Sequence, residues 1–326
     1  MRRSVLVLCA LALLGVSLLA VSFGSGSATL SDLLVPGGRG RTILLDYRLP
    51  RVLLGAVAGA GLAAVGASFQ CVLRNPLAEP YVLGVSGGAA LGATLALAVG
   101  VAGASWLGAA GVPAAAFAGG LLATAVVWGL VRVGRGGGTS ILLAGVVVNA
   151  IAGAWIAILE SLSPPGRVQS VVWWLMGSLD VPSWGQLGFV SLYVAGGLAA
   201  LLLDAARMNV LSLGDESAAA LGVDVPALER RVVLAGAAVV GAIVSVTGLI
   251  GFVGLVVPNA LRRSIGPDLR ILLPASALGG AATLVACDLL VRLASRVLHG
   301  ELPVGALTAL AGGPVFLVLL LKGRSG

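Results

Sequence analysis

Long apolar blocks that carry almost no charge follow one another along this chain. A helix needs about 20 mostly apolar residues to cross the hydrocarbon core of a bilayer, so the blocks predict membrane spans. We place ten of them, at residues 4–23, 50–71, 81–102, 113–132, 140–159, 185–204, 231–250, 252–264, 271–290 and 303–322. The block at 252–264 is too short to cross alone, and its boundaries are the least constrained.

The composition agrees with a membrane protein. Hydrophobic residues make up 59% of the chain and charged residues 10%, whereas soluble domains carry about a quarter charged residues. The 49 glycines suit membrane helices, which associate by close backbone approach because lipid supplies no hydrophobic force between them. We therefore predict an all-α, polytopic membrane protein of about ten transmembrane helices, with residues 1–326 forming one membrane domain.

The distribution of positive charge predicts the orientation. With the N-terminus in the cytoplasm, most Arg and Lys residues fall in cytoplasmic loops, as the positive-inside rule requires. Ten spans then place both termini in the cytoplasm of a multi-pass inner-membrane protein. The first block, behind Arg2 and Arg3, also has features of a cleaved signal peptide. We interpret it as an uncleaved span, because it is long for a signal core.

The charge distribution does not indicate a nucleic-acid partner, and the cysteines indicate neither disulfides nor a metal site. The net charge of +7 comes from scattered arginines, with no basic stripe or aromatic platform for a nucleic acid. Cys9, Cys71 and Cys287 are odd in number, widely spaced and set in apolar blocks, which suggests neither a disulfide framework nor a metal site. We expect a lipid bilayer around the chain, and no nucleic acid, metal or cofactor.

One inner loop, residues 205–231, is longer than the others. Ser212 and Asp215 have capping-box spacing ahead of an Ala-rich stretch, and Gly222 supplies a helix stop. Asp224, followed by a proline, then favours a second helix start. The loop therefore predicts a short cytoplasmic helix on which a soluble partner docks; an idle amphipathic connector is the alternative.

Missing motifs limit the mechanism. The chain has no G-x-x-x-x-G-K-[ST] loop, and its only lysine is Lys322, so ATP must be bound by another subunit if it drives the protein. Asp288, Glu160 and Asp204 lie toward span ends, and the span centres lack the ionisable groups of proton or sodium relays. This pattern favours a conduit opened by an attached partner. An ion- or proton-coupled secondary transporter is the alternative.

Five long motifs stand in order along the chain. They are RLPRVLLGAVAGAGLAAVGASFQCVLRNPLAEPYVLGVSGGAALGA at 48–93, WWLMGSL at 173–179, LGDESAAALGV at 213–223, GLIGFVGLVVPNALRRSIGPDLRILLP at 248–274, and ELPVGALTALAGGPVFLVLLLK at 301–322. Together they resemble the FecCD/BtuC-type permeases, the membrane subunits of type II ABC importers for ferric siderophores, haem and cobalamin. The resemblance covers nearly the whole chain. It implies a BtuC-like permease fold and a transport subunit that is not itself an enzyme.

The resemblance also implies roles for individual residues. The segment at 213–223 resembles the coupling helix that seats in a groove of the ATPase subunit, which here comprises Leu213, Gly214, Asp215, Glu216, Ala219, Leu221 and Gly222. Thr139 and Ser140 match a small polar pair that narrows the inner end of the pathway, although simple helix N-capping would explain them equally well. Arg48, Arg51 and Arg292 match outer-face arginines that pair with acidic residues of a soluble binding protein, as opposite charges orient a docking partner.

The same resemblance predicts the assembly and marks one departure. One chain offers one docking segment, whereas two ATPase subunits need two, so we expect a two-fold homodimer. The substrate expected first is a ferric siderophore, followed by haem and cobalamin. At Pro258–Asn259 the family usually has Pro-His. A role that needs a titratable imidazole is lost here, but a neutral hydrogen-bonding role is retained.

Overall fold

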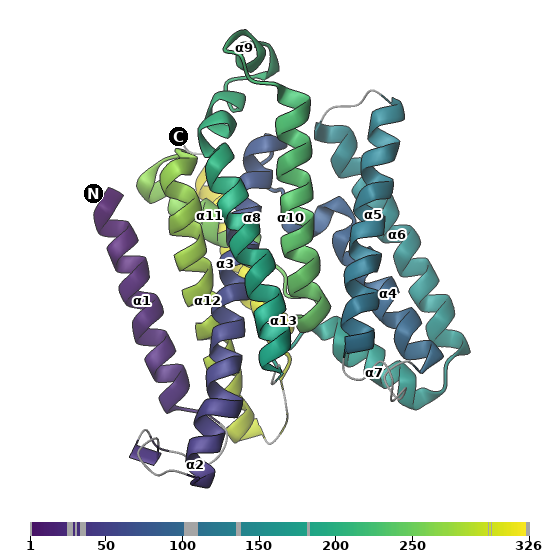
Figure 1. The fold of residues 1–326 in the computed structure, drawn as a ribbon, viewed down its shortest axis with the longest axis vertical. Helices are drawn as coiled ribbons and strands as arrows, with labels where there is room; N and C mark the ends of the chain where they lie inside the picture. Colours follow the sequence, from purple (N-terminus) through teal and green to yellow (C-terminus); the bar gives the residue numbers. More distant parts are fainter. Residues whose placement is uncertain are drawn as a thin grey trace.

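A computed structural model of the chain describes residues 2–24, 29, 31–32, 37–100, 110–134, 138–180, 183–298, 300 and 302–323. All regular secondary structure in these residues is helical (Figure 1). The longer helices are α1 (Arg2–Ser22), α3 (Leu49–Val72), α4 (Val85–Val99), α5 (Gly111–Gly134), α6 (Gly138–Leu162), α8 (Trp184–Leu211), α10 (Val225–Thr247), α11 (Val253–Ile265), α12 (Leu269–Leu298) and α13 (Val304–Gly323). The shorter elements are α2 (Arg39–Thr42), the π-helix η2 (Ile43–Arg48), the 3-10 helix η3 (Pro80–Leu83), α7 (Pro165–Met176) and α9 (Asp215–Ala220).

Each of the ten predicted blocks overlaps one of the longer helices. Seven helical stretches are long and apolar enough to cross a membrane: α1, the continuous α2–η2–α3 stretch, α5, α6, α8, α10 and α12. α4 and α13 are shorter apolar helices, and α11 has 13 residues. The prediction of an all-α polytopic membrane protein is confirmed, and α11 is as short as its sequence block.

Two helical segments were not predicted. The predicted blocks leave residues 24–49 outside any span, but α2 and η2 continue into α3 and form one helical stretch, Arg39–Val72, of 34 residues. α7 was also missed. It begins with Pro165 in its first turn, where the fixed φ of proline suits a helix start, and it ends at Met176, followed by Gly177 with a φ of 70°.

The central helix of the bundle is α3. In its most apolar window 78% of the residues are buried, against 6% for α1, so α3 fills the core and α1 lies on the outside. α3 packs against α8, α10, α11 and α12. A Cβ atom on Gly59 of α3 would collide with the carbonyl oxygen of Gly280 on α12, and the reverse substitution would collide too. These glycines allow the close helix approach expected in a membrane.

The two ends of the bundle differ (Figure 1). α9 stands at one end, above α8 and α10, whereas α2 and α7 lie at the other. We refer to them as the α9 end and the α2 end. α1 begins in the half of the molecule nearer α9 and runs toward the α2 end. The predicted site residues therefore fall at two opposite ends of the molecule.

Candidate functional site

The α9 segment, residues 205–231, joins α8 to α10. Gly214, with a φ of 119°, turns the chain into α9 and occupies its N-cap position without a side-chain cap. Ser212 Oγ donates to the carbonyl oxygen of Asn209 at 2.6 Å instead. The capping box predicted from Ser212 and Asp215 is therefore wrong, because the chain turns at the intervening glycine and the serine belongs to the end of α8.

The C-terminal half of the α9 segment, from Ala220 onward, agrees with the sequence prediction. α9 ends at Ala220, and Gly222 adopts a left-handed φ of 82°, so that the Val223 amide donates to the Ala218 carbonyl at 3.0 Å. Asp224 caps α10, its carboxylate accepting from the Ala227 amide at 3.0 Å. The helix stop and the second helix start are both confirmed.

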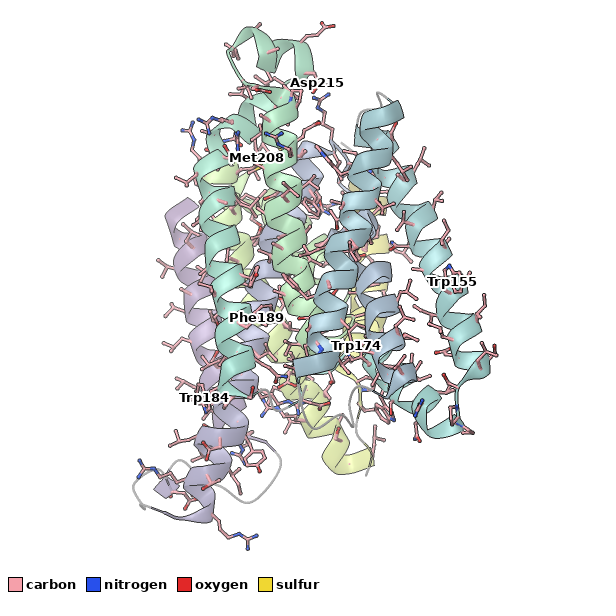
Figure 2. The ribbon with its side chains drawn as sticks, turned by 45° about the vertical axis from the view of Figure 1, so that its right-hand side comes forward. Trp155, Trp174, Trp184, Phe189, Met208 and Asp215 are labelled. Atoms are coloured by element: carbon pink, nitrogen blue, oxygen red, sulfur yellow. The ribbon has the colours of Figure 1, made fainter. Side chains whose placement is uncertain are left out.

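α9 presents an accessible face at the tip of the molecule. Leu213 and Leu221 flank it and are 68% and 65% exposed. Ala219 is also exposed, whereas Ala218 is buried against the bundle. Asp215 lies at this tip as well (Figure 2). Two large apolar side chains left open beyond the ends of the long helices make this a candidate protein-docking surface.

Polar contacts at two residues of the α9 segment, Asn209 and Asp215, tie it to the bundle, and the sequence did not reveal them. Arg74, in the turn after α3 with a φ of 47°, forms an ion pair with Asp215. Asn209 near the end of α8 donates to Asp268 at 2.7 Å and accepts from the Leu269 amide at 2.9 Å. These contacts link α9 to the turn after α3, and the end of α8 to the start of α12.

Asn259 on α11 plays a neutral hydrogen-bonding role. Its Nδ2 donates to the carbonyl oxygens of Pro76, at 2.8 Å, and Leu255, at 2.9 Å. Its Oδ1 accepts from Arg262 Nη1 at 3.0 Å, and Arg262 Nη2 donates to Gln70 Oε1 at 2.9 Å. The amide therefore joins α11 to α3 and to the turn after it. This agrees with the role expected to survive without an imidazole.

The chain between α10 and α11 is held by side chains from the η3 region. Tyr81 Oη donates to the carbonyl oxygen of Ile250 at 2.8 Å and accepts from the same residue's amide at 2.9 Å. A carboxylate oxygen of Glu79 accepts from the Phe252 amide at 2.6 Å, where the N-terminus of α11 favours negative charge. Irregular backbone between apolar helices must be satisfied inside the protein. Sequence reasoning missed both residues.

At the α2 end, two of the predicted arginines face inward. Arg48 is 4% exposed, and its Nη1 donates to the carbonyl oxygens of Val21 and Ser22, each at 2.9 Å. Arg292 is 5% exposed and donates to the carbonyl oxygen of Ala20 at 2.9 Å. The last carbonyls of a helix have no partner within it. The two arginines therefore cap α1, a role that differs from the outward-facing one expected.

Asp288 joins the remaining arginine to this group, and we call Arg48, Arg51, Arg292 and Asp288 the arginine cluster. Asp288 is 1% exposed and lies 2.9 Å from both Arg51 Nε and Arg292 Nε. Arg51 has the most exposed side chain of the three arginines. It lines a cavity of about 600 Å³ between α7, α12 and the start of α13. Sequence analysis placed Asp288 at a span end but assigned it no partner.

Thr139 and Ser140 lie in the first turn of α6. Ser140 is half-buried, and the side chain of Thr139 lies outside the described residues. Their position at a helix start fits both interpretations of this pair, the pathway constriction and the helix cap.

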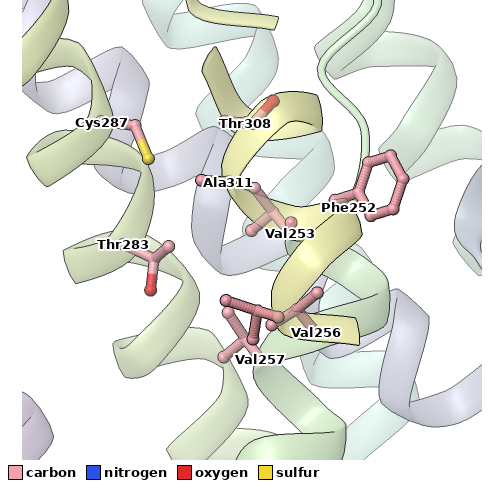
Figure 3. Close-up of a pocket in the computed structure, with 10 residues that line it drawn as sticks. Phe252, Val253, Val256, Val257, Thr283, Cys287, Thr308 and Ala311 are labelled. Atoms are coloured by element: carbon pink, nitrogen blue, oxygen red, sulfur yellow. The ribbon is translucent and has the colours of Figure 1, made fainter. Parts of the chain in front are cut away.

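A second cavity of about 130 Å³ lies between α11, α12 and α13 (Figure 3). Val253 and Val257 on α11 face Thr283 and Cys287 on α12, with Thr308 on α13 closing the side. Its lining residues are apolar or uncharged. No group of three or more His, Cys, Asp or Glu side chains that could hold a metal ion comes together within the described ranges.

A bundle of apolar helices with an exposed short helix at one end does not by itself specify a function, and a family comparison supplies it. The model of the FecCD transport family matches residues 8–322. The chain belongs to this family. FecCD membership confirms a multi-pass transport protein that is not an enzyme.

Two FecCD relatives and one solved structure show how far the similarity reaches. The hemin transport system permease protein of Yersinia pestis is 42% identical over 282 residues, which cover 86% of this chain and 84% of the relative. The cobalamin import system permease protein of Halobacterium salinarum is 44% identical over 282 residues, covering 86% and 73%. A structure of a metal-chelate type ABC transporter, in an inward-facing conformation, has 31% identity and a TM-score of 0.87, covering 98% of this chain and 99% of that one. The permease fold implied by the motifs is confirmed.

Proposed function

We propose that this FecCD chain is the membrane-spanning permease subunit of an ABC importer for a ferric siderophore or a related metal chelate, such as haem or cobalamin. The observation that carries the proposal is the exposed α9 segment, on a chain that has no phosphate-binding loop of its own. The relatives named as hemin and cobalamin permeases support the substrate class. A separate ATPase subunit then supplies the driving force.

The α9 segment is the proposed seat of the ATPase subunit. Leu213 and Leu221 are long enough to insert into a partner's groove, and the small exposed Ala219 lets the partner approach closely. The acidic side chains of Asp215 and Glu216 lie in the first turn of α9. The full coupling surface comprises Leu213, Gly214, Asp215, Glu216, Ala219, Leu221 and Gly222.

Two copies of the chain are proposed to form a two-fold dimer that carries two ATPase subunits. An isologous pair provides two identical docking segments from one sequence. ATP binding and hydrolysis by the partners would then move both α9 segments, and the pathway would change access because the partners bind its two states differently. Thr139 and Ser140 are proposed to narrow this pathway at the start of α6, near its inner end.

The α2 end is the proposed docking face for a soluble binding protein. Arg51 supplies the contact, because its guanidinium is partly exposed beside a cavity whose lining includes Trp174, Ser178 and Asp180. Arg48 and Arg292 contribute positive charge from below the surface. An acidic residue of the binding protein would be attracted to this face, in a salt-dependent manner.

This arrangement sets the proposed location. The α9 end faces the cytoplasm together with both termini, and the helices cross the cell inner membrane. Residues 1–326 form one permease domain, a proposal supported by structural similarity over 98% of the chain.

Reconstitution tests the proposal. The chain, co-expressed with an ATPase subunit and a binding protein from the same organism, is placed in proteoliposomes and offered a ferric siderophore, haem or cobalamin. We expect uptake of one of them with ATP on the α9 side, and none with an imposed proton gradient alone. Uptake driven by the gradient without ATP would support the secondary-transporter alternative and contradict the proposal.

A further inference from the structure

A groove between α8 and α10 opens on the surface of the bundle near the α9 end. Its volume is about 460 Å³, and it lies between neighbouring faces of the two helices. The floor and rim toward the middle of the bundle are apolar, with Leu203 81% exposed and Leu234 54% exposed. Two arginines, Arg207 on α8 and Arg231 on α10, stand at the opposite end of the groove.

The charge in the groove is positive and accessible. Arg207 and Arg231 share one carboxylate, that of Asp204, at 2.7 Å and 2.9 Å. Their side chains remain 58% and 47% exposed. They give Asp204 three N–H bonds in total, whereas each guanidinium carries five donors. The group therefore has one excess positive charge, and both arginines keep donors for a further anionic acceptor.

The depth of the arginines matches a lipid headgroup. Arg207 lies four residues before the end of α8 and Arg231 six residues after the start of α10, about 6 and 9 Å along each helix. Leu203 and Leu234 lie about one turn further from the α9 end. The groove is thus cationic near the helix ends and apolar about one turn further into the bundle, the polarity order of a phospholipid.

We propose that this groove binds one anionic phospholipid of the leaflet on the α9 side, with its phosphate on Arg207 and Arg231 and an acyl chain against Leu203 and Leu234. Positively charged pockets between membrane helices suit anionic headgroups. Arginine side chains at this depth also reach toward the interface while their stems cover apolar surface. A zwitterionic phospholipid carries no net charge to balance the excess on the arginines, so it binds more weakly.

Native mass spectrometry of the purified chain in neutral detergent, titrated with phosphatidylglycerol or phosphatidylcholine, measures this preference. We expect wild-type protein to retain phosphatidylglycerol, and Arg207→Gln to weaken that retention about fivefold, since one arginine near the surface contributes about that factor. Arg207→Gln leaves the Arg231–Asp204 pair in place, so the fold is spared. Arg270→Gln, which removes an exposed arginine at the start of α12 on the same side, is the matched control and leaves retention unchanged.

A second variant and a competition experiment distinguish lipid binding from the alternatives. Asp204→Asn frees both guanidinium groups, so it strengthens phosphatidylglycerol retention, and glycerol 3-phosphate does not compete because it lacks acyl chains. Equal retention of the two lipids, or an equal loss in Arg207→Gln and Arg270→Gln, would overturn the proposal. Competition by glycerol 3-phosphate would indicate a free-phosphate site, and a changed oligomeric state of Arg207→Gln without lipid would indicate that a second copy covers the groove. Either result overturns the lipid assignment.

Discussion

The α9 segment and the arginine cluster lie at opposite ends of the molecule and were both predicted to meet soluble partners. In the α9 segment, the apolar side chains Leu213 and Leu221 are open at the tip. In the arginine cluster, Arg48 and Arg292 are buried and bonded to the carbonyl oxygens that end α1. The apolar residues are thus outside and many of the charged ones inside, the reverse of the usual rule for soluble proteins.

This contrast separates a structural role of buried charged residues from a partner-binding role of exposed apolar residues. Charges within or near the bilayer are costly and become paired or bonded to backbone carbonyls, so the cluster primarily fastens α1, α3 and α12 together. Large apolar side chains that stay exposed together beyond the long helices mark a site where another protein can bind. The α9 segment is therefore the proposed partner surface, and at the α2 end Arg51 forms the accessible edge of a largely structural cluster.

The largest expected effect on the folded state comes from Asp288→Ala. The change leaves Arg292 buried without its counter-charge, and breaking a buried ion pair costs about 3–5 kcal/mol. We expect most of the protein to be lost from the monodisperse fraction in gel filtration. Asp215→Ala, which removes the exposed partner of Arg74, is the control and should behave as wild type. Similar behaviour of the two variants would show that the cluster does not hold the fold.

Arg48→Gln should have a smaller effect, confined to α1. The shorter amide cannot reach the carbonyl oxygens of Val21 and Ser22, and losing hydrogen bonds from a charged donor costs about 1.5–3 kcal/mol. We expect a lower thermal unfolding temperature and faster proteolysis at the end of α1. Arg39→Gln on exposed α2 should change neither. If Arg48→Gln is as stable as Arg39→Gln, the bonds of Arg48 to α1 do not stabilise the fold and the capping role is excluded.

Arg74→Ala should change stability least. Its ion pair with Asp215 is solvent-exposed, and such pairs contribute about 0–1 kcal/mol. We expect an unchanged unfolding temperature but a reduced transport rate per ATP hydrolysed, because α9 loses its link to α3. Restoration of the rate by the charge-reversed pair, Arg74→Asp with Asp215→Arg, would confirm the link; a wild-type rate in the single variant would exclude it.

Local signals explain what the sequence revealed. The apolar blocks located all ten long helices, because apolar length alone predicts a span. Gly222 and Asp224 located the end of α9 and the start of α10, because caps act within one turn. The same reasoning selected the wrong capping box: Ser183 and Gln186 form one at the start of α8, whereas Ser212 belongs to the end of that helix.

Long-range contacts explain what the sequence concealed. Arg292 bonds to a carbonyl 272 positions away, and Arg74 pairs with a residue 141 positions away. A single sequence carries no local pattern for such pairs, so burial of the arginines could not be predicted from charge alone. Tyr81 was missed for the same reason, since its hydroxyl bonds to Ile250, 169 positions away.

The most direct test of the account is an Ala219→Arg variant measured for ATPase capture and transport in the same vesicles. Ala219 is exposed on α9, so a bulky charge there should leave folding and membrane insertion intact while blocking close approach of the ATPase subunit. The account predicts normal amounts of monodisperse permease, loss of the co-purifying ATPase and loss of ATP-driven uptake. Retention of the ATPase with normal uptake would contradict it and make the α9 segment an idle connector.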